Sequence, residues 1–203
     1  MSKIEVDTID TVTGTTTLQV GSTNVSTINL GASGDTINIP SGATFNVNGT
    51  VGTMSGQNYP AFQAYLSSNQ SVTSNTTTKV QIDTEVFDTD GYFDNSTNYR
   101  FTPLVAGKYF VHGSVFGDPG NTSDLSYVIV YLYKNGSENM NQKFDFRSNE
   151  GRDANLNFST IIDMNGSTDY IELYGLVKAL DNSGTLFGGT NKRTYFGAYR
   201  IGD

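Results

Sequence analysis

Hydrophobic and polar residues alternate with a period of two in several short runs of this chain, and no long run has the period of a helix. Tyr99 and Phe101 alternate with polar neighbours in one run, and Tyr109 and Val111 do so in the next. Side chains of a strand point to opposite faces in turn. The pattern therefore predicts strands that each bury one face.

Turn-forming residues separate these runs. Pro103 lacks an N–H group and Gly107 permits a tight bend, so residues 102–108 are predicted to form a corner between two strands. Asp90 and Gly91 suit a tight turn between two aromatic-rich runs. We expect a hairpin at this second point.

The same signals recur along the later part of the chain. Asn135 and Gly136 are typical of a type I′ turn and close a long apolar run. About ten short strands in roughly 145 residues predict an all-β sandwich of the jelly-roll type. Further strands are predicted at residues 59–66, 79–83, 85–87, 126–136, 158–164, 170–174 and 194–201.

Composition changes sharply near residue 58. The chain has 12 Tyr and 12 Phe, and of these 24 aromatic residues only Phe45 precedes Tyr59. The first segment therefore lacks the side chains for a compact core of its own. We predict two parts, an attachment and shaft segment over residues 1–57 and a head over residues 58–203.

The first segment contains a short repeat. Pairs of apolar residues recur at nearly regular spacing, and each pair is followed by Gly, Pro or Asn-Gly. One chain cannot bury enough of these side chains to offset the ordering of its backbone. Three chains around one axis could, so we predict a triple-stranded β shaft; the alternative is a disordered linker. The axis positions are Leu18, Val20, Ile28, Leu30, Ile37, Ile39, Phe45 and Val47.

The order of turn, strand, corner and strand between residues 87 and 112 resembles the centre of the C1q/TNF-like jelly roll. The terminal run also matches that family through Phe196, Gly197, Tyr199 and Ile201. Ser167 and Thr168 make the turn after Asn165 longer than the family pattern. The resemblance implies a homotrimer that binds partners and does not catalyse. The matching central positions are Phe87, Asp88, Gly91, Asp94, Thr97, Phe101, Pro103, Gly107, Tyr109 and Val111.

Composition excludes several classes of function. The chain has no cysteine and one histidine, which excludes disulfides, zinc fingers and multi-histidine metal centres. Its net charge of −8 comes without a basic cluster, which argues against nucleic-acid partners. No window is long and apolar enough to span a membrane, and the amino terminus lacks the apolar run of a signal peptide. We expect a soluble protein made in the cytoplasm.

The sequence lacks the common catalytic motifs for nucleophilic hydrolysis, phosphate binding and dinucleotide binding. The single histidine, His112, follows an apolar run and is best interpreted as structural, with a protonation-sensitive contact at a subunit interface as the alternative. Pairs of carboxylates could cleave glycans only if the fold brings them together. We therefore expect no enzymatic activity.

Three carboxylates, Asp88, Asp90 and Asp94, surround a glycine turn. Hard oxygen ligands of this kind bind Ca²⁺, which makes calcium the one candidate cofactor. The group lacks a bidentate glutamate, and aspartates commonly begin such turns without a metal. The simpler interpretation is a metal-free turn.

An opening such as Ser2 to Ile9, followed by Thr/Gly-rich repeats and a C1q-like head, resembles fibre and appendage proteins of tailed phages. The resemblance implies a protein of the virion surface that is made in the host cytoplasm. Its amino terminus would dock to other virion proteins, and its head would bind a host-surface glycan or protein. The candidate docking residues are Ile4, Val6 and Ile9.

Loops 117–125 and 181–193 are the candidate receptor contacts. Two adjacent cations in the second loop could meet an acidic glycan, although a solvated charge pair is the simpler interpretation. Three alternative functions stay open: a capsid-decorating or head-fibre protein, a secreted bacterial adhesin or lectin, and a small glycan-cleaving tailspike. The candidate contact residues are Asp118, Asn121, Asp124, Lys192 and Arg193.

Overall fold

The computed structural model divides the chain into two units, Met1–Gly52 and Thr53–Asp203. The division lies near the boundary that composition predicts before Asn58. The residues that the structure describes are 20, 27–28, 35–44, 46, 58–120, 123–146 and 148–202.

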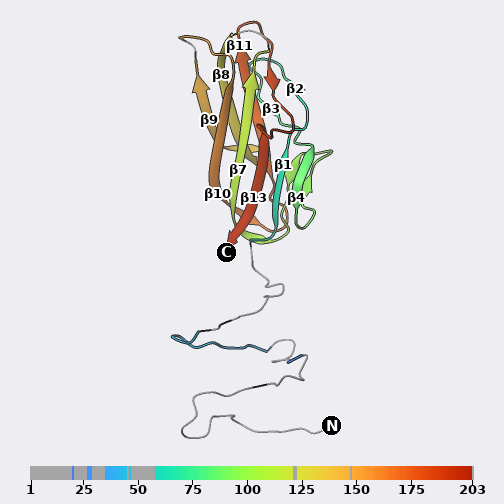
Figure 1. Cartoon of the computed structure of the whole chain (residues 1–203), viewed down its shortest axis with the longest axis vertical. Coiled ribbons are helices and arrows are strands. Elements are labelled where there is room, and N and C mark those ends of the chain that lie inside the picture. The colour runs from blue at the N-terminus through green and yellow to red at the C-terminus, as the bar shows by residue number, and fades with distance from the viewer. Residues whose placement is uncertain are drawn as a thin grey trace. The chain divides into compact units, whose positions relative to one another are not determined.

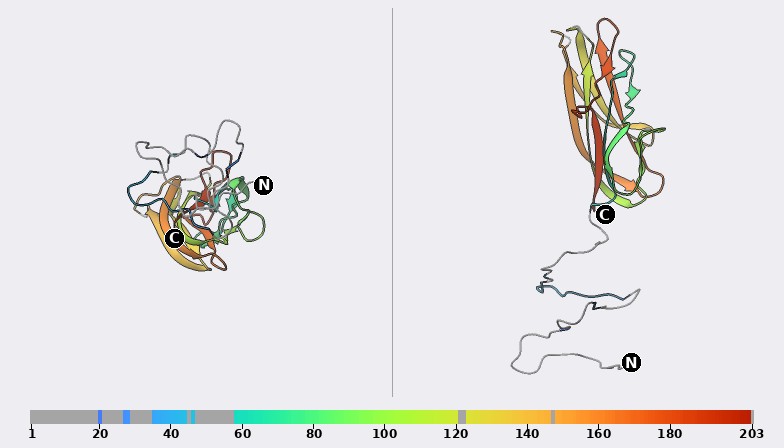
Figure 2. Two further views of the ribbon diagram at one scale, coloured as in Figure 1. Left: turned by 90° about the horizontal axis from the view of Figure 1, so that it is seen from below. Right: turned by 45° about the vertical axis from the view of Figure 1, so that its right-hand side comes forward.

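The head is a sandwich of two antiparallel sheets, and its described residues form no helix (Figure 1). The long strands of both sheets run along the length of the head (Figure 2). Sheet A contains β1 (Ala61–Tyr65), β2 (Gln70–Ser71), β4 (Thr84–Asp88), β7 (Ala106–Asp118), β10 (Ala154–Asn165), β12 (Thr185–Leu186) and β13 (Tyr195–Gly202). Sheet B contains β3 (Thr78–Lys79), β5 (Phe93–Asp94), β6 (Arg100–Phe101), β8 (Leu125–Lys134), β9 (Ser137–Asp145) and β11 (Ile171–Ala179).

The all-β jelly-roll prediction is confirmed, with more and shorter strands than the pattern predicts. Thirteen strands form the described head, and five of them have only two residues. Strands of two residues carry too few positions to show an alternation, so the pattern misses β2 and β12, whereas β3 and β6 coincide with predicted runs. No described segment forms a helix with the length and apolarity needed to cross a bilayer.

Strand β7 organises sheet A. It pairs along its whole length with β10 on one side, and with β13 and β12 on the other. Tyr109, Val111 and Val115 are fully buried and point toward sheet B, as the period-two pattern predicts. Residues between them point to the opposite face of sheet A.

The centre of the core is aromatic and joins the two sheets. The ring of Phe62 in sheet A stacks on Phe93 and on Phe101 of sheet B, with centroids 4.5 Å apart in both pairs. Phe196 meets Phe62 edge-on at 5.3 Å. Each fully buried ring stabilises the fold by about 1.5–3 kcal/mol relative to its exposed state. The family-like positions Phe101 and Phe196 are therefore core positions.

The hairpin predicted at Asp90 and Gly91 is wrong. Strand β4 before this turn pairs with β1 in sheet A, and β5 after it pairs with β6 in sheet B. The turn therefore crosses between the sheets, and it brings Phe93 into the core while Phe87 before it stays exposed. The corner at 102–108 is confirmed, since β6 lies in sheet B and β7 in sheet A.

Two other predicted turns differ in kind. Asn135 and Gly136 have φ values of 53° and 75°, as a type I′ hairpin between β8 and β9 requires. Residues 165–169 join β10 in sheet A to β11 in sheet B, and the side-chain oxygen of Asn165 accepts hydrogen bonds from the backbone N–H groups of Ser167, Thr168 and Asp169. The longer turn thus connects the two sheets, and the Asn165 side chain satisfies its backbone N–H groups.

The described residues of the first unit are all exposed and contain one turn, in which the N–H of Ala43 donates to the carbonyl of Pro40 at 3.0 Å. Val20 and Ile37 are each 60% exposed, and Ile28 and Ile39 are each 45% exposed. A single chain does not bury these positions, and the triple-stranded shaft stays a prediction. The remaining predicted positions lie outside the described residues: Ile4, Val6, Ile9, Leu18, Leu30, Phe45 and Val47.

Candidate binding surfaces

Aromatic side chains cover the outward surface of sheet A. Phe110 and His112 of β7 lie beside Tyr195 and Tyr199 of β13, with ring centroids 5.4 to 5.9 Å apart. They project outward because they alternate with the core residues of the same strands. All four are partly exposed. We call this surface the aromatic face; its rings are Tyr65, Phe110, His112, Phe116, Tyr195 and Tyr199.

A glycine seats His112 within the aromatic face. Gly197 lies opposite His112 in the register of β13 and β7, and a Cβ atom at position 197 would lie 2.7 Å from Cε1 of the imidazole. Burial lowers the pKa of His112 below its usual 6.5. The imidazole is therefore neutral near pH 7 and adds no charge to this surface.

One edge of the aromatic face, on β10, carries an ion pair. Ile161, which lies opposite Phe110, is 58% exposed and extends the apolar surface. Two residues further along, Lys108 and Asp163 form an ion pair at 3.4 Å. An apolar centre with a polar rim is the usual anatomy of a protein–protein interface.

The cations predicted as loop contacts lie against aromatic rings of the head. Nζ of Lys192 is 5.4 Å from the centroid of Tyr65. The guanidinium of Arg193 is 4.9 Å from the ring of Phe116 and 5.2 Å from that of Phe187. Both cations therefore cover one end of the aromatic face. Cation–π contacts of this kind contribute about 0.5–2 kcal/mol each.

The structure brings the two predicted contact loops together. The carboxylate of Asp124 accepts a hydrogen bond from the N–H of Asp181 at 3.2 Å, which ties one loop to the other. Asp118 accepts a hydrogen bond from the N–H of Gly120 at 2.7 Å, and Asn121 lies outside the described residues. An open hollow between the loops is lined by Ser71, Val72, Pro119, Gly120, Asp181, Ser183, Gly184 and Thr185.

The three carboxylates of the glycine turn hold loops in place. Asp88 accepts hydrogen bonds from the backbone N–H groups of Asp90, Gly91 and Phe93. Asp94 accepts from those of Ser96, Thr97 and Asn98, and these hydrogen bonds, led by that of Thr97, lower the pKa of Asp94 far below its usual value. The described residues hold no group of three or more His, Cys, Asp or Glu placed to bind a metal ion.

The outward surface of sheet B carries tyrosines together with charged residues. The rings of Tyr133 and Tyr174 stack with centroids 4.2 Å apart, and Tyr131 meets Tyr133 edge-on at 6.2 Å. Nζ of Lys143 lies 3.9 Å from the ring centroid of Tyr127. We call this surface the tyrosine face; it comprises Lys79, Arg100, Tyr127, Tyr131, Tyr133, Lys143, Glu172 and Tyr174.

A buried carboxylate fixes one cation of the tyrosine face. Glu172 is 3% exposed, and its Oε1 lies 2.5 Å from Nζ of Lys79. Burial alone lowers the pKa of Lys79, but the hydrogen bond and negative charge of Glu172 outweigh it and raise that pKa overall. Burial, followed by the charge of Glu172, raises the pKa of the Tyr174 hydroxyl. Both groups keep their usual charge at neutral pH.

Sequence reasoning missed the tyrosine face, although a signal for it is present. The long run over residues 126–136 has two alternating sets of positions, or parities, one for each face of a strand. The first parity holds Tyr127, Tyr131 and Tyr133, and the second holds Val128, Val130 and Leu132. When both parities of a strand carry large apolar or aromatic side chains, one face builds the core and the other is available as an interaction surface. Only the second parity is needed for the core.

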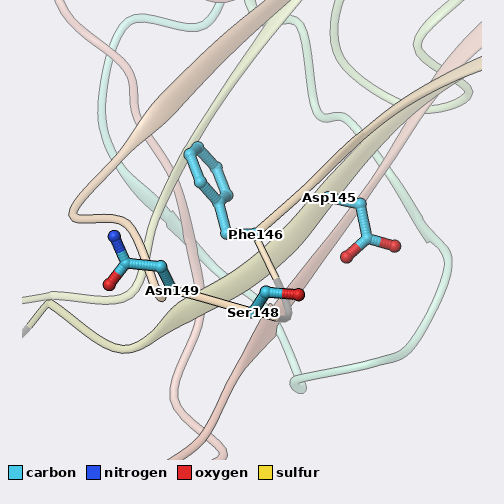
Figure 3. A pocket seen from close by; sticks show the side chains of 4 residues that line it. All are labelled: Asp145, Phe146, Ser148 and Asn149. Carbon is cyan, nitrogen blue, oxygen red and sulfur yellow. The ribbon is translucent and has the colours of Figure 1, made fainter.

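An open hollow of about 620 Å³ lies at the end of β9 and is shown in Figure 3. Asp145, Phe146, Ser148 and Asn149 line it. The ring of Phe146 packs beside Phe144, with centroids 4.6 Å apart, and the Phe146 carbonyl accepts a hydrogen bond from the N–H of Asn149 at 2.7 Å. These four residues contain one carboxylate and no histidine or lysine, so they do not form an acid–base pair.

Comparison with solved structures identifies the fold. The chain is similar to a TNF protein, Eiger, from S. frugiperda, with 8% identity, a TM-score of 0.54, and coverage of 72% of this chain and 95% of that one. It is similar to murine APRIL, with 9% identity, a TM-score of 0.50, and coverage of 70% and 98%. The globular domain of zebrafish complement 1qA matches with 13% identity, a TM-score of 0.47, and coverage of 70% and 97%. The head thus has a TNF-like jelly-roll fold.

Sequence comparisons give no further assignment. No family model matches the chain. No curated protein sequence matches it either.

Proposed function

We propose that this protein is a short, homotrimeric fibre on the surface of a phage particle. The head over residues 58–203 binds a host-surface receptor, and residues 1–57 form a shaft that attaches to other virion proteins. The protein is made in the host cytoplasm and has no catalytic role. Three heads on one fibre raise the apparent affinity for a surface that carries many receptor copies.

The aromatic face is the observation that carries this proposal. Phe110, His112, Tyr195 and Tyr199 lie together on the outside of sheet A, where the described chain places no element over them. A cluster of rings of this kind on a soluble protein marks an interaction surface. A copy of the same chain is its simplest partner, and the C1q/TNF-like resemblance favours three copies.

The first segment supports the fibre part of the proposal. Its apolar pairs recur over residues 18–47 with a turn residue after each pair. Ile37 and Ile39 remain exposed in one chain, as expected if other chains cover them. A trimeric head would hold three such segments at one end and so favour their association.

The mass of the full-length protein in solution tests the proposal. One chain has a mass of 22.0 kDa, so light scattering should give about three times that value. A protein that stays at the mass of one chain at micromolar concentrations would remove the multivalent mechanism.

Attachment to the particle is tested separately. Labelled, purified protein is added to particles that lack it, and electron microscopy locates the label on the particle. Label on the tail supports a tail fibre, and label over the shell assigns the protein to capsid decoration. Release of reducing ends from host polysaccharide would instead indicate a glycan-cleaving tailspike.

A further inference from the structure

The tyrosine face differs in charge from the rest of the molecule. The strands of sheet B carry five basic and four acidic residues, whereas those of sheet A carry two basic and four acidic residues. The whole chain has a net charge of −8. Sheet B therefore offers an anionic ligand the more favourable potential of the two sheets.

Two cations of this face are held in fixed positions. Arg100 lies opposite Glu172 in the register of β6 and β11, and its guanidinium lies 4.5 Å from the ring centroid of Tyr170. Lys79 donates hydrogen bonds to Glu172 at 2.5 Å and to the carbonyl of Asn98 at 3.2 Å. A ligand that meets them loses little further side-chain entropy.

The rings beside these cations suit a sugar. Tyr174 lies opposite Lys79 in the register of β11 and β3, and it stacks on Tyr133. An aromatic ring offers an apolar surface to the C–H groups of a sugar, and a tyrosine hydroxyl both donates and accepts hydrogen bonds. A planar guanidinium matches the two oxygens of a carboxylate. Rings and cations lie within one patch of four strands, β3, β6, β8 and β11.

We propose that the tyrosine face is a binding site for acidic glycans. The apolar face of a sugar ring packs on the side of the Tyr133 ring that Tyr174 does not cover, and its carboxylate or sulfate group accepts hydrogen bonds from Arg100. The proposal rests on the proposed function, since it names the ligand class and the site of the receptor-binding head. It places this site on a sheet and not on the predicted loops.

Competing occupants fit the face less well. Nucleic acid carries a negative charge on every nucleotide, and Glu172, Glu138 and Asp145 lie among the cations of sheet B. A second copy of the chain would bury Lys79, Arg100 and Lys143, which requires removing their charges from water. A glycan with widely spaced anionic groups avoids both penalties.

Isothermal titration of the full-length protein tests the site. The probes are oligosaccharides of galacturonic acid, of sialic acid and of sulfated galactose, with a neutral oligogalactose of the same length. We expect at least one acidic probe to bind at least tenfold more tightly than the neutral one. Failure of all three acidic probes to bind at about 1 mM overturns the proposal, as does equal affinity for the neutral probe.

Matched variants locate the binding. Arg100→Gln should weaken the acidic probe about tenfold, because it removes a charge-assisted hydrogen bond. Arg152→Gln makes the same change at an exposed arginine between β9 and β10 and should leave affinity within about twofold. Tyr133→Ala should weaken binding roughly fivefold, and Tyr133→Phe, which keeps the ring, should weaken it less. Equal losses for the two arginine variants overturn the assignment.

The same samples separate this proposal from the proposed function. Light scattering before each titration gives the mass of the protein. Binding by a protein with the mass of one chain supports the glycan site and overturns the trimer. A trimer that binds none of the acidic probes supports the trimer and overturns the glycan site.

Discussion

The two outward faces of the sandwich both carry aromatic rings, but they differ in how charge is arranged around them. In the middle of the aromatic face, Phe110 and His112 lie against other rings, and the Lys108–Asp163 ion pair stays at the edge. Lys192 and Arg193 lie over rings at one end of that face. In the tyrosine face, charges lie within the patch, where Lys143 lies over Tyr127 and the buried Glu172 pairs with Lys79. A surface that excludes charge from its centre is suited to permanent burial, whereas one that keeps paired charges is suited to a polar ligand in water.

This difference between the two faces arises from the outward-facing residues of each strand, which alternate with its core residues. In the middle of β7 and β13, the outward positions hold the rings of Phe110, His112, Tyr195 and Tyr199 beside the small Gly197, and the charged Lys108 lies toward one end. In β11 the outward positions include Glu172 and Lys178. The inward parity is apolar in both sheets and builds the same core. Fold and function are therefore encoded in alternate residues of the same strands.

A negative charge introduced into each face should give the largest difference between the two faces. Phe110→Asp puts a carboxylate in the middle of the aromatic face, and we expect it to convert the trimer to single chains, because burying an unpaired charge costs several kcal/mol. Tyr131→Asp makes the equivalent change in the tyrosine face and should leave the mass unchanged. Light scattering measures both, and circular dichroism checks that each variant is folded.

The opposite result would exchange the roles of the two faces. If Tyr131→Asp produced single chains and Phe110→Asp did not, sheet B would be the subunit interface. The acidic-glycan site would then lose its access to solvent.

Loss of the buried carboxylate should have the next largest effect. Glu172→Gln leaves Lys79 beside a neutral group that is nearly excluded from water, and we expect the free energy of unfolding to fall by about 2 kcal/mol. Lys79→Met combined with Glu172→Gln should recover much of this loss. Urea denaturation measures both variants. Equal losses for the single and double variants would mean that the ion pair does not stabilise sheet B.

A methyl group at position 197 should perturb the aromatic face without adding charge. In Gly197→Ala the new Cβ would lie 2.7 Å from the His112 ring and 3.1 Å from the carbonyl of Phe62, so the imidazole must move. We expect the midpoint of thermal unfolding to fall, in line with about 1 kcal/mol of overpacking, and the trimer to dissociate at higher dilution. Ser159→Ala is the control, since Ser159 is exposed, lies opposite His112 in the register of β10 and β7, and the change adds no bulk beside the ring. A Gly197→Ala protein that matches this control would exclude a close fit of His112.

The sequence predicts well which residues of a strand face the core, and it predicts poorly what the outward-facing residues contact. Tyr109 and Val111 are identified as buried from their alternation alone, and the corner between β6 and β7 follows from Pro103. The stacking of Arg193 on Phe116 is not predictable in this way, because these residues lie far apart in the sequence and meet only through strand pairing. The hairpin expected at Gly91 fails for the same reason. A local turn signal gives the reversal of the chain and not the sheet that receives it.

Lowering the pH should distinguish the aromatic face from the tyrosine face, and we expect this effect on stability to be the smallest of those predicted. His112 is the single histidine of the chain, and its burial lowers its pKa in the folded protein below the 6.5 of an unfolded chain. The unfolded chain therefore binds more protons than the folded one in this range, and stability falls as the pH decreases from about 6.5 toward the lower folded pKa. Oligomer contacts that bury His112 further should enlarge this loss.

The histidine-to-glutamine variant isolates the effect. His112→Gln cannot titrate, so the part of the pH dependence between about pH 6.5 and 5 that belongs to His112 should disappear in it. Lys79 and Tyr174 of the tyrosine face have raised pKa values and stay in one protonation state over that range. Urea denaturation and light scattering at each pH, on both proteins, measure stability and assembly together. Identical pH profiles for the two proteins would show that His112 is not buried by assembly, and would move the subunit contact away from the centre of the aromatic face.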